Sequence, residues 1–570
     1  MKLSGAHIVW RTLMAEGVEV VFGFPGGTIM PIYDALLDYP IRHVLVRHEQ
    51  GAAHMADAYA RATGKVGVAM ATSGPGSTNL VTGIANALMD SVPVVFITAQ
   101  VSSSLIGFDA FQETDVTGIT LPITKHNYLV TDVRELGAVL REAFYIARSG
   151  RPGPVLVDIA KDVELNTTDW EYDPSPVQLS GYRPDYPLPA EDLASAVDLV
   201  KSARRPLILA GHGVLLSGAM AELQEFAVRT HTPVAMTLLS LGCFPSEHPL
   251  NLGMMGMHGE AFVNTAIQEA DLLLAVGMRF DDRVTGALKT YAPNAKKIHL
   301  EIDPSEINKN VKVDVAMIGD LRHSLVCLMK GAGECDHEEW LDYINGLKRE
   351  TAARDIQNQP DDGHLYAAHV INDLSTFTGG NALIVTDVGQ NQMWAAQYYK
   401  ANRPGKFISS GGLGTMGFGL PAGIGAKFGC PDDEVWVIAG DGGFQMTQAE
   451  LATAAQEGVK VNIVLLNNGY LGMVRQWQEL FFNRRYSATP LTGPDFVKIA
   501  EAHGLTGLRV TRRSEVKEAF RKARETEGTV LIEFKVEPED NVYPMVPAGA
   551  DLKNMIRRPL QNPMLMGADD

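Results

Sequence analysis

The sequence is poor in cysteine and has no long apolar run. Its four cysteines show no spacing typical of a metal site or a disulfide framework. No stretch of about 18 apolar residues occurs, so we expect no membrane-spanning helix. The apolar pattern between Met1 and Val21 is broken by Arg11 and Glu16, unlike a signal peptide. These absences predict a cytoplasmic protein in a reducing compartment.

Positive charge is also scarce. The chain has 49 Lys and Arg against 67 Asp and Glu, which gives a formal net charge of −18 at pH 7. This sign opposes nonspecific binding to nucleic acid or anionic lipid. We therefore expect neither a nucleic-acid nor a membrane partner.

The length of 570 residues exceeds a single hydrophobic core and suggests about three domains. Two stretches, Asn166 to Pro189 and Gly331 to Gly363, are polar and rich in proline or charge, and we interpret them as linkers rather than helices or strands. The two linkers divide the chain into three blocks. Each block alternates strand-like apolar runs with helical segments, which predicts an α/β fold of parallel sheets flanked by helices. The predicted boundaries are 1–168, 190–345 and 368–540 for the domains, 169–189 and 346–367 for the linkers, and 541–570 for a C-terminal tail.

Two motifs in the third block predict a metal site. Gly440-Asp441-Gly442 follows a predicted strand over Val435 to Ala439, and Asn467-Asn468 follows a second over Val461 to Leu466, with a helix expected over Gln448 to Glu457. Such a crossover brings both motifs to the carboxyl edge of one sheet. Mg²⁺ takes carboxylate and amide oxygens together with substrate phosphates. Each motif alone is usually a turn, but together they predict a thiamine-diphosphate enzyme.

Glu49 is the candidate acid in the first block. A strand is predicted over His43 to Arg47, and a helix begins at Glu49. A carboxylate at this position also suits the helix dipole without any catalytic role. Thiamine, however, needs a carboxylic acid against its pyrimidine nitrogen before its own amino group can act as a base. We therefore predict that Glu49 supplies that acid.

Glycine-rich turns mark further ligand contacts. Phe22 to Gly27 and Thr72 to Ser77 each follow an apolar run and allow close backbone approach. Asp387 to Asn391 follows the first strand of the third block, so its backbone amides and side chains are candidates for holding diphosphate oxygens. Gly412 to Gly417 matches the dinucleotide pattern G-x-G-x-x-G, but no full strand precedes it and no ribose-binding acid follows. A nicotinamide site is therefore disfavoured.

With these residues assembled, the chain resembles the catalytic subunit of acetohydroxyacid synthase, also called acetolactate synthase, over nearly its whole length. The motifs that carry the resemblance are Phe24-Pro25-Gly26-Gly27, Arg47-His48-Glu49-Gln50-Gly51, Ser73-Gly74-Pro75-Gly76, Phe111-Gln112-Glu113, Arg151-Pro152-Gly153-Pro154, Arg279-Phe280-Asp281-Asp282-Arg283 and Gly472-Met473-Val474-Arg475-Gln476-Trp477.

The resemblance implies a domain order and partners. The first domain would bind the pyrimidine of thiamine diphosphate, the central domain FAD, and the third the diphosphate with Mg²⁺. Active sites would be shared across the interface of a homodimer or homotetramer, so that Glu49 faces the Mg²⁺ of the neighbouring subunit. A separate small regulatory subunit would bind, and the tail from Tyr543 to Arg558 would close over the site as a lid.

It also implies cofactor contacts. The metal ligands would be Asp441, Asn468 and the backbone carbonyl of Tyr470. Thiamine diphosphate would contact Glu49, Gln390, Asn391, Gly414, Met416, Gly442 and Met473. FAD, in a largely structural role, would contact Arg151, Gly211, His212, Gly213, Met257, His258, Gly277, Arg279, Asp281, Arg283, Val284, Glu301 and Asp320.

The implied reaction is decarboxylation of pyruvate to a hydroxyethyl-thiamine intermediate. That intermediate condenses with a second pyruvate or with 2-ketobutyrate, giving 2-acetolactate or 2-aceto-2-hydroxybutyrate for branched-chain amino-acid synthesis. Arg283 is the candidate for the carboxylate of the second ketoacid. Trp477 would favour 2-ketobutyrate through its extra methyl group. Gly27 and Gln112 would lie near the reacting centre, and Lys161 at the substrate channel.

Three positions depart from the commonest family pattern: Asn391 replaces a histidine, Ala160 a proline and Ser102 a proline. Asn391 can still donate a hydrogen bond to the diphosphate. Ser102 lies where family members contact herbicides, so sensitivity to them stays open.

Several rivals share the three-domain plan. An FAD-dependent pyruvate oxidase is the main alternative, which Arg283 and Trp477 together disfavour. A flavin-free acetolactate synthase is disfavoured by the Arg279 to Arg283 match. Glyoxylate carboligase is disfavoured by Glu49, and a catalytically silent subunit by Glu49 with the metal ligands.

Overall fold

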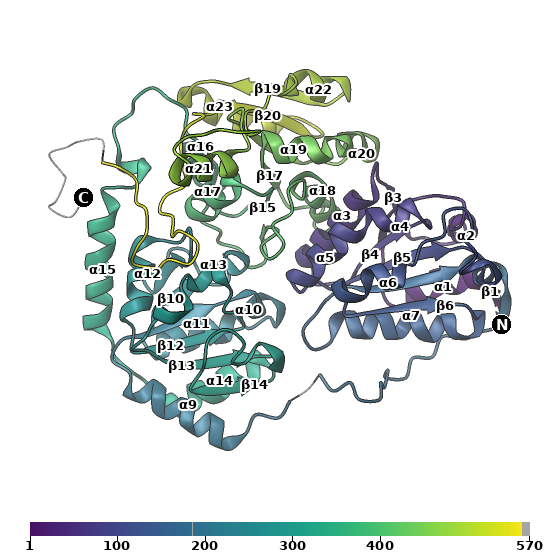
Figure 1. The fold of residues 1–570 in the computed structure, drawn as a ribbon, viewed down its shortest axis with the longest axis horizontal. Helices are drawn as coiled ribbons and strands as arrows, with labels where there is room; N and C mark the ends of the chain where they lie inside the picture. Colours follow the sequence, from purple (N-terminus) through teal and green to yellow (C-terminus); the bar gives the residue numbers. More distant parts are fainter. Residues whose placement is uncertain (185, 561–570) are drawn as a thin grey trace.

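The computed structural model describes residues 1–184 and 186–560, so one position of the first predicted linker and the last ten of the predicted tail lie outside it. It contains three six-stranded parallel sheets, each flanked by helices, as Figure 1 shows. The α/β fold with three sheets, predicted from the sequence, is confirmed. We call each sheet with its helices the first, middle and third unit.

The first unit has the strand order β3-β2-β4-β5-β7-β6. Its central strands are buried along their whole length because helices cover both faces of the sheet. The strands are β2 (Val20–Phe24), β3 (Arg42–Leu45), β4 (Gly67–Ala71), β5 (Val94–Gln100), β6 (His126–Val130) and β7 (Val155–Ala160), and a separate antiparallel pair joins β1 (Lys2–Ser4) to β8 (Thr167–Asp169). The helices are α1 (Gly5–Ala15), α2 (Met30–Leu36), α3 (Glu49–Thr63), α4 (Pro75–Asn79), α5 (Val81–Met89), α6 (Val116–Thr120), α7 (Val133–Arg148) and α8 (Lys161–Leu165).

The third unit repeats this topology, with the order β16-β15-β17-β18-β20-β19. When the strands of each sheet are numbered in sequence order, the second lies at one edge and the fifth at the other in both units. The sequence alone had left this similarity open. The strands are β15 (Leu383–Thr386), β16 (Phe407–Ile408), β17 (Val435–Gly440), β18 (Asn462–Asn467), β19 (Thr506–Val510) and β20 (Val530–Lys535). The helices are α16 (Ala367–Thr378), α17 (Gln390–Tyr398), α18 (Gly419–Gly429), α19 (Asp441–Thr447), α20 (Leu451–Glu457), α21 (Gly472–Phe481), α22 (Phe496–Ala502) and α23 (Val516–Glu525).

The middle unit has a different order, β11-β10-β9-β12-β13-β14. Counted along the chain this is 3-2-1-4-5-6, the order of doubly wound dinucleotide-binding sheets, which bind ligands in the crevice where the order reverses. That crevice lies beyond the ends of β9 and β12. The strands are β9 (Pro206–Ala210), β10 (Val234–Met236), β11 (Asn251–Met254), β12 (Leu272–Val276), β13 (Lys296–Glu301) and β14 (Val315–Ile318). The helices are α9 (Ala190–Ser202), α10 (His212–Leu216), α11 (Met220–Arg229), α12 (Ala261–Glu269), α13 (Asp282–Thr285), α14 (Leu321–Ala332) and α15 (Glu338–Ala352).

Helices α3 and α18 join the first and third units. A single core of buried side chains runs from Phe22 of β2 through Met55 of α3 to Val437 of β17. A Cβ placed on Gly425 of α18 would lie 2.1 Å from the carbonyl oxygen of Met55. Glycine is therefore required where these two helices cross.

The prediction of an irregular linker from 331 to 363 is wrong in its central part, where α15 forms. The outer surface of α15 is polar, and the helix buries only Trp340 and Ile344. The indole N–H of Trp340 donates to the carbonyl oxygen of Pro206 at 3.0 Å. These two anchors are too few to stand out against the charged composition of the stretch.

The C-terminal segment leaves the third unit after β20 and returns across the middle unit, drawn in yellow in Figure 1. The backbone N–H of Val546 donates to the carbonyl oxygen of Met257 at 2.9 Å, and that of Ala287 donates to Ala550 at 2.9 Å. The described part of the tail is thus docked on the middle unit.

A buried ion network ties the first unit to a loop of the third. The Arg61 guanidinium lies 2.6 Å from Asp57 and 2.8 Å from Asp90, and all three side chains are almost fully buried. Arg61 also donates to the carbonyl oxygen of Ser409 at 2.9 Å. The network therefore fixes the start of the loop that follows β16.

Replacing Arg61 by Met should leave both aspartates buried without their cation. Loss of one partner from such a site costs about 3 to 5 kcal/mol. The midpoint of chemical denaturation should therefore fall strongly. The matched control is Lys65→Gln, which removes an exposed ion pair to Glu19. The Lys65 side chain is 48% exposed and that of Glu19 is 66% exposed. That change should cost less than about 1 kcal/mol. Equal shifts in the two variants would contradict the assigned role of Arg61.

Candidate active site

The carboxyl edge of the third sheet brings the predicted metal ligands together. Asp441 directly follows β17, and Asn468 directly follows the neighbouring strand β18. A carboxylate oxygen of Asp441 accepts the backbone N–H of Gly469 at 3.1 Å. The side-chain amide oxygen of Asn468 accepts the backbone N–H of Tyr470, also at 3.1 Å. Burial raises the pKa of Asp441 to about 6. A carboxyl group withdrawn from water in this way suits a cation site.

Other predicted cofactor residues surround this pair. A Cβ placed on Gly472, the first residue of α21, would lie 2.2 Å from Oε1 of Gln390 and 2.8 Å from Nδ2 of Asn468. One placed on Gly442 would lie 3.6 Å from Cε of Met416. The glycines therefore leave a cradle at this edge that any side chain would fill. Met473 follows Gly472 in the first turn of α21.

The polar residues after β15 hold neighbouring loops of the third unit. Asp387 is fully buried, and its carboxylate accepts the N–H groups of Gly417 and Gly419 at 3.0 and 2.9 Å. The Asn391 amide donates to the carbonyl oxygens of Asp387 and Ile438 at 2.9 and 3.1 Å. Both side chains are thus occupied in holding loops. That the backbone amides and side chains of Asp387 to Asn391 hold diphosphate oxygens stays a prediction.

Glu49 and its neighbours form a second group, at the carboxyl edge of the first sheet. Glu49 begins α3, as predicted, is 8% exposed, and accepts a hydrogen bond from Asn79 at 2.9 Å. A Cβ on Gly76 would lie 3.3 Å from Glu49, and one on Gly74 would lie 2.9 Å from Gln112. The second glycine-rich turn therefore joins Glu49 to Gln112.

Gly27 and Lys161 lie at the same edge. Thr28, next to Gly27, bonds through its hydroxyl to that of Thr72 at 2.8 Å, which links the two glycine-rich turns. Lys161 begins α8 directly after β7, and its neighbour Asp162 accepts the hydroxyl and N–H of Ser103 at 2.6 and 2.7 Å. The four first-unit residues predicted near the chemistry thus share one edge of one sheet.

The Glu49 group and the Asp441 group remain separate within one chain. Among the described residues, no hydrogen bond or ion pair joins them. The N–H groups of Arg47 and His48 do reach Glu450 of the third unit, both at 3.1 Å, but Glu49 itself does not. Beside Gln112 the loop exposes large apolar side chains, with Phe108 at 77% and Phe111 at 87% exposure. In the single chain, this part of the first unit therefore leaves large apolar side chains exposed to solvent.

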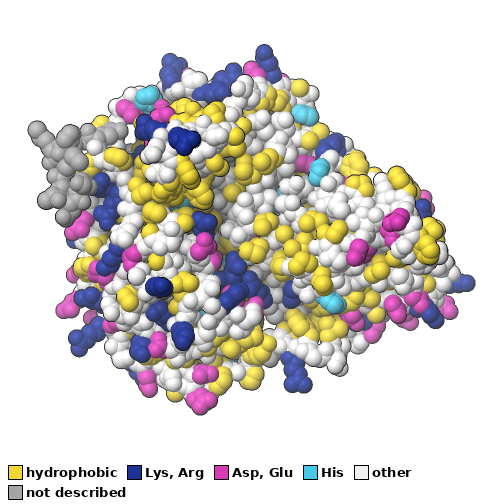
Figure 2. Space-filling model, in the orientation of Figure 1, with side chains coloured by type: hydrophobic (Ala, Val, Ile, Leu, Met, Phe, Trp, Pro, Cys, Tyr) yellow, Lys and Arg dark blue, Asp and Glu magenta, His cyan; other side chains and the backbone are white. Residues whose placement is uncertain are grey.

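A cavity of about 900 Å³ lies at the crevice of the middle sheet, where all three units meet. Figure 2 shows Lys and Arg side chains beside the hollow between the units. Of the residues predicted for FAD, all but Gly211 line it: Arg151, His212, Gly213, Met257, His258, Gly277, Arg279, Asp281, Arg283, Val284, Glu301 and Asp320. Gly414, Met473 and Trp477 of the third unit line it as well.

The floor of the crevice depends on glycines. A Cβ on Gly211, after β9, would lie 2.3 Å from the carbonyl oxygen of Gly277, after β12. Gly277 has φ +59°, in the left-handed region. The two loops touch only because neither residue has a side chain, which explains why Gly211 supports the cavity without lining it.

Charged groups of the cavity differ in how they are paired. Arg151 is held by Asp303 at 3.1 Å and Glu306 at 3.0 Å. Burial raises the pKa of Glu301 to about 7 and lowers that of His258 to about 4. The Arg283 side chain is 53% exposed, and its guanidinium lies 3.7 Å from the nearest carboxylate, that of Asp282. Arg283 therefore keeps a cation available for an anionic ligand.

Trp477 is 40% exposed and lines the same cavity, so it is not an ordinary buried aromatic.

The residues that hold the loop after β16 were not predicted from the sequence. Asp90 accepts the N–H groups of Gly411 and Gly412 at 3.0 and 2.6 Å, and Asn86 accepts the Ser410 hydroxyl at 2.6 Å. Both lie in or just after α5, where no motif marks them.

Comparison with known families identifies the class. Three profiles of the thiamine pyrophosphate enzymes match this chain: the N-terminal TPP binding domain over residues 3–119, the central domain over 193–328 and the C-terminal TPP binding domain over 387–534. The chain therefore belongs to the thiamine pyrophosphate, or thiamine diphosphate, enzyme family.

Relatives of similar length identify a more specific family within this class. The acetolactate synthase large subunit of Corynebacterium glutamicum is 49% identical over 561 residues, covering 96% of this chain and 89% of that protein. The acetolactate synthase isozyme 2 large subunit of Escherichia coli is 47% identical over 557 residues, covering 98% of this chain and all of that protein. Within the thiamine enzymes, the chain belongs to the family of acetolactate synthase large subunits, which confirms the resemblance.

In the described part of the chain, no helix is both long and apolar enough to cross a membrane. The cytoplasmic location expected from the sequence stays a prediction.

Proposed function

We propose that this chain is the catalytic subunit of an acetohydroxyacid synthase. It would release CO₂ from pyruvate and join the remaining two-carbon unit to a second pyruvate or to 2-ketobutyrate, giving 2-acetolactate or 2-aceto-2-hydroxybutyrate. One observation carries the proposal: the cation of Arg283 and the exposed indole of Trp477 share a cavity with Gly414 and Met473 from the predicted thiamine site. The names of the relatives supply the substrate class.

Thiamine diphosphate, when bound, supplies an electron sink for the carbanion that decarboxylation leaves. Asp441, Asn468 and the Tyr470 carbonyl would hold Mg²⁺, the oxygen ligand set that this ion prefers. Their meeting at one sheet edge, with the cradle left by Gly442 and Gly472, supports this assignment. Gln390, Asn391, Gly414, Met416 and Met473 would complete the cofactor contacts, with Asn391 acting through the loops it holds.

Glu49 would hold a proton against the pyrimidine nitrogen of the cofactor. Glu49 is buried, and among the described residues its carboxylate accepts a side-chain hydrogen bond from Asn79 alone, which leaves one carboxyl oxygen for that purpose. Gly27 and Gln112 would approach the reacting atoms from the same edge, and Lys161 would line the approach of the substrate.

FAD would occupy the crevice of the middle sheet. The doubly wound strand order, the cavity of about 900 Å³ and the glycine contact between Gly211 and Gly277 all support a dinucleotide there. No net oxidation occurs in the proposed reaction, so the chain's residues would bind the flavin for structure rather than for electron transfer.

The second ketoacid would place its carboxylate against Arg283, whose planar fork matches a carboxylate. Its alkyl group would then face the indole of Trp477 across the cavity. The contact is apolar, so it favours the longer chain of 2-ketobutyrate over that of pyruvate.

Two chains would complete each active site. The separation of the Glu49 and Asp441 groups in one chain and the exposed Phe108 and Phe111 support a homodimer or homotetramer. The relatives are named large subunits, which supports a small regulatory partner. We also propose the domain boundaries 1–168, 190–345 and 368–540, with linkers between them and the segment from 541 onward as a lid.

The reaction can be tested directly with the purified chain, thiamine diphosphate, Mg²⁺ and FAD. Pyruvate alone should give acetolactate, and added 2-ketobutyrate should divert product to acetohydroxybutyrate without stoichiometric flavin reduction. Acetate or acetyl phosphate with flavin turnover would instead establish the alternative, an FAD-dependent pyruvate oxidase.

Trp477→Leu should lower the preference for 2-ketobutyrate while acetolactate still forms. A single methyl group is worth about 1 to 3 kcal/mol, so the preference to be lost is about tenfold to a hundredfold. The measurement is the product ratio in mixtures of the two ketoacids. Phe481→Leu is the matched control, since Phe481 lies on the same helix, is 45% exposed and does not line the cavity. An unchanged ratio in Trp477→Leu would refute the role of the indole.

A further inference from the structure

A second cavity, of about 370 Å³, lies between the middle and third units under α15 and the C-terminal tail. It shares only Met254 with the larger cavity and contains none of the residues assigned above to catalysis or cofactor binding. Its volume is in the range of sites for small molecules.

The lining of this cavity is cationic. Five cations line it, Lys348, Arg354, Lys400, Arg557 and Arg558, against two carboxylates, Glu260 and Asp355. In a chain of net charge −18 this local excess of positive charge runs against the general sign. Such a cluster attracts an anion more strongly than scattered surface cations do, because the cavity walls exclude water.

Several of these charges have no anionic partner. Within residues 1–184 and 186–560, Lys348, Lys400 and Arg557 form no ion pair. The Lys348 ammonium lies 5.7 Å from the centre of the Phe262 ring, and the Lys400 ammonium donates to the backbone carbonyl oxygen of Gln397 at 2.8 Å. Arg558, by contrast, is paired with Asp540 at 2.8 Å.

Gln397 gives independent evidence for a ligand. Its side chain is 6% exposed and lines the cavity. Its amide nitrogen donates to the carbonyl oxygens of His258 and Tyr543 at 2.9 and 3.1 Å, which fixes its orientation. Its side-chain carbonyl oxygen, Oε1, has no hydrogen-bond partner within the described part of the chain. A buried acceptor left without a donor is unfavourable, so the site calls for a ligand with an N–H or O–H group.

The remaining wall is apolar and partly aromatic. Phe244, Phe262, Tyr398 and Tyr543 contribute rings, and Met236 and Leu241 contribute aliphatic surface. The aromatic and aliphatic side chains would bury a short apolar body beside the charged groups.

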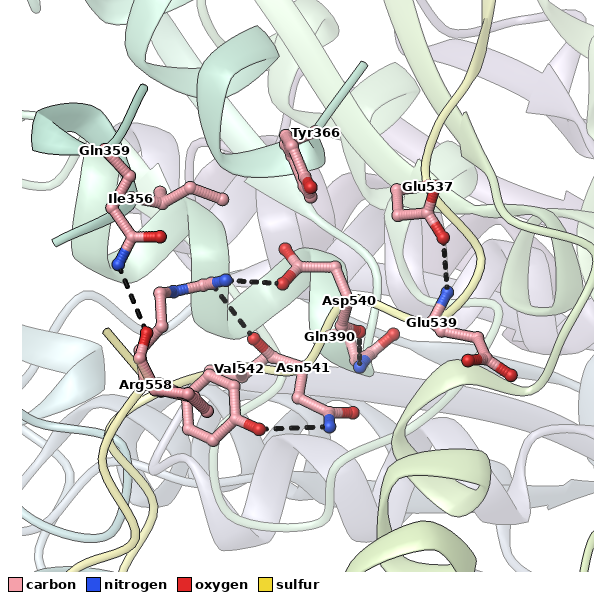
Figure 3. A network of polar contacts seen from close by, with 12 residues as sticks. Ile356, Gln359, Tyr366, Gln390, Glu537, Glu539, Asp540, Asn541, Val542 and Arg558 are labelled. Atoms are coloured by element: carbon pink, nitrogen blue, oxygen red, sulfur yellow. Dashed lines mark hydrogen bonds and ion pairs between the residues drawn. The ribbon is translucent and has the colours of Figure 1, made fainter. Parts of the chain in front are cut away.

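The tail that closes this cavity is anchored at its far end. In Figure 3, Arg558 reaches the carboxylate of Asp540 and the backbone carbonyl oxygen of Asn541. The Asn541 side-chain amide donates to the Tyr543 hydroxyl at 3.3 Å. Asp540 in turn accepts a hydrogen bond from Gln390 through its backbone oxygen at 3.0 Å. The wall formed by Tyr543 and Arg558 is therefore held by specific hydrogen bonds and an ion pair.

We propose that this second cavity binds a small organic carboxylate that carries a hydroxyl or amino group beside the carboxylate and a short apolar body. The carboxylate faces Lys348 and Arg557, the O–H or N–H donates to Gln397, and the apolar body packs on the aromatic wall. The proposal does not depend on the reaction proposed above, because the two cavities have different charged groups and different walls.

Calorimetric titration of the holoenzyme, loaded with thiamine diphosphate, Mg²⁺ and FAD, tests the proposal with three matched probes. 3-Phenyllactate has both polar groups, 3-phenylpropanoate lacks the hydroxyl, and 3-phenylpropan-1-ol lacks the carboxylate. We expect saturable binding of phenyllactate, binding of phenylpropanoate about tenfold weaker because the Gln397 acceptor stays unpaired, and still weaker binding of the alcohol.

Variants locate the bound probe. Lys348→Gln combined with Arg557→Gln should weaken phenyllactate binding at least about tenfold, since both unpaired cations are lost. The matched control, Lys201→Gln with Arg204→Gln on and after α9, removes two exposed cations outside the cavity and should change nothing. Absence of saturable binding, equal affinity for the three probes, or loss of binding in Arg283→Gln but not in the double variant would overturn the proposal.

Discussion

The buried guanidinium of Arg61 is the contact on which the arrangement of the three units depends. It is held between Asp57 and Asp90 in α3 and at the end of α5, and it reaches the backbone of Ser409. Desolvating three charges is unfavourable, and it is tolerated because nearly every polar atom finds a partner. Asp90 uses its remaining capacity on the N–H groups of Gly411 and Gly412. The loop that carries Gly414 and Met416 is therefore positioned by the first unit, although it belongs to the third.

The same network reaches the middle unit. The His212 ring lies 2.9 Å from the carbonyl oxygen of Asp90, at the mouth of the middle-sheet crevice. Burial lowers the pKa of His212 to about 4, so the ring bonds there as a neutral imidazole. One residue at the end of α5 thus contacts both the loop of the predicted thiamine site and the crevice proposed for FAD. The shared cavity follows from this junction.

Parallel sheets explain how residues far apart in sequence come together. Each strand delivers its following loop to the same edge, so Asp441 and Asn468 meet although a helix separates their strands. The first and third sheets have one strand order, and each presents its own set of site residues. The middle sheet has another order and opens a crevice instead. The division into two edges that carry the predicted thiamine residues and one crevice that carries the residues predicted for FAD is therefore a property of topology.

Much of this could be predicted from the sequence. The strands before Asp441 and Asn468 and the start of α3 at Glu49 were predicted because apolar runs and glycine-rich turns mark them. The cofactor contacts, by contrast, rested on the resemblance, since no spacing rule links Arg151 to Asp320.

Other features could not have been predicted. The Arg61 network joins residues that are hundreds of positions apart and carries no motif. Helix α15 was missed because only two of its side chains are buried. The inward turn of Asp387 and Asn391 depends on which backbone groups need partners, which composition does not reveal.

We propose that Glu49 of one chain and Asp441 of another complete each active site. Co-expressing Glu49→Gln with Asp441→Ala tests it, since mixed dimers would contain one site with both residues intact. Each variant alone should be nearly inactive, and the mixture should recover about a quarter of the wild-type activity if chains pair at random. A mixture no more active than the variants, although mixed dimers are detected, would mean that each site is built within a single chain.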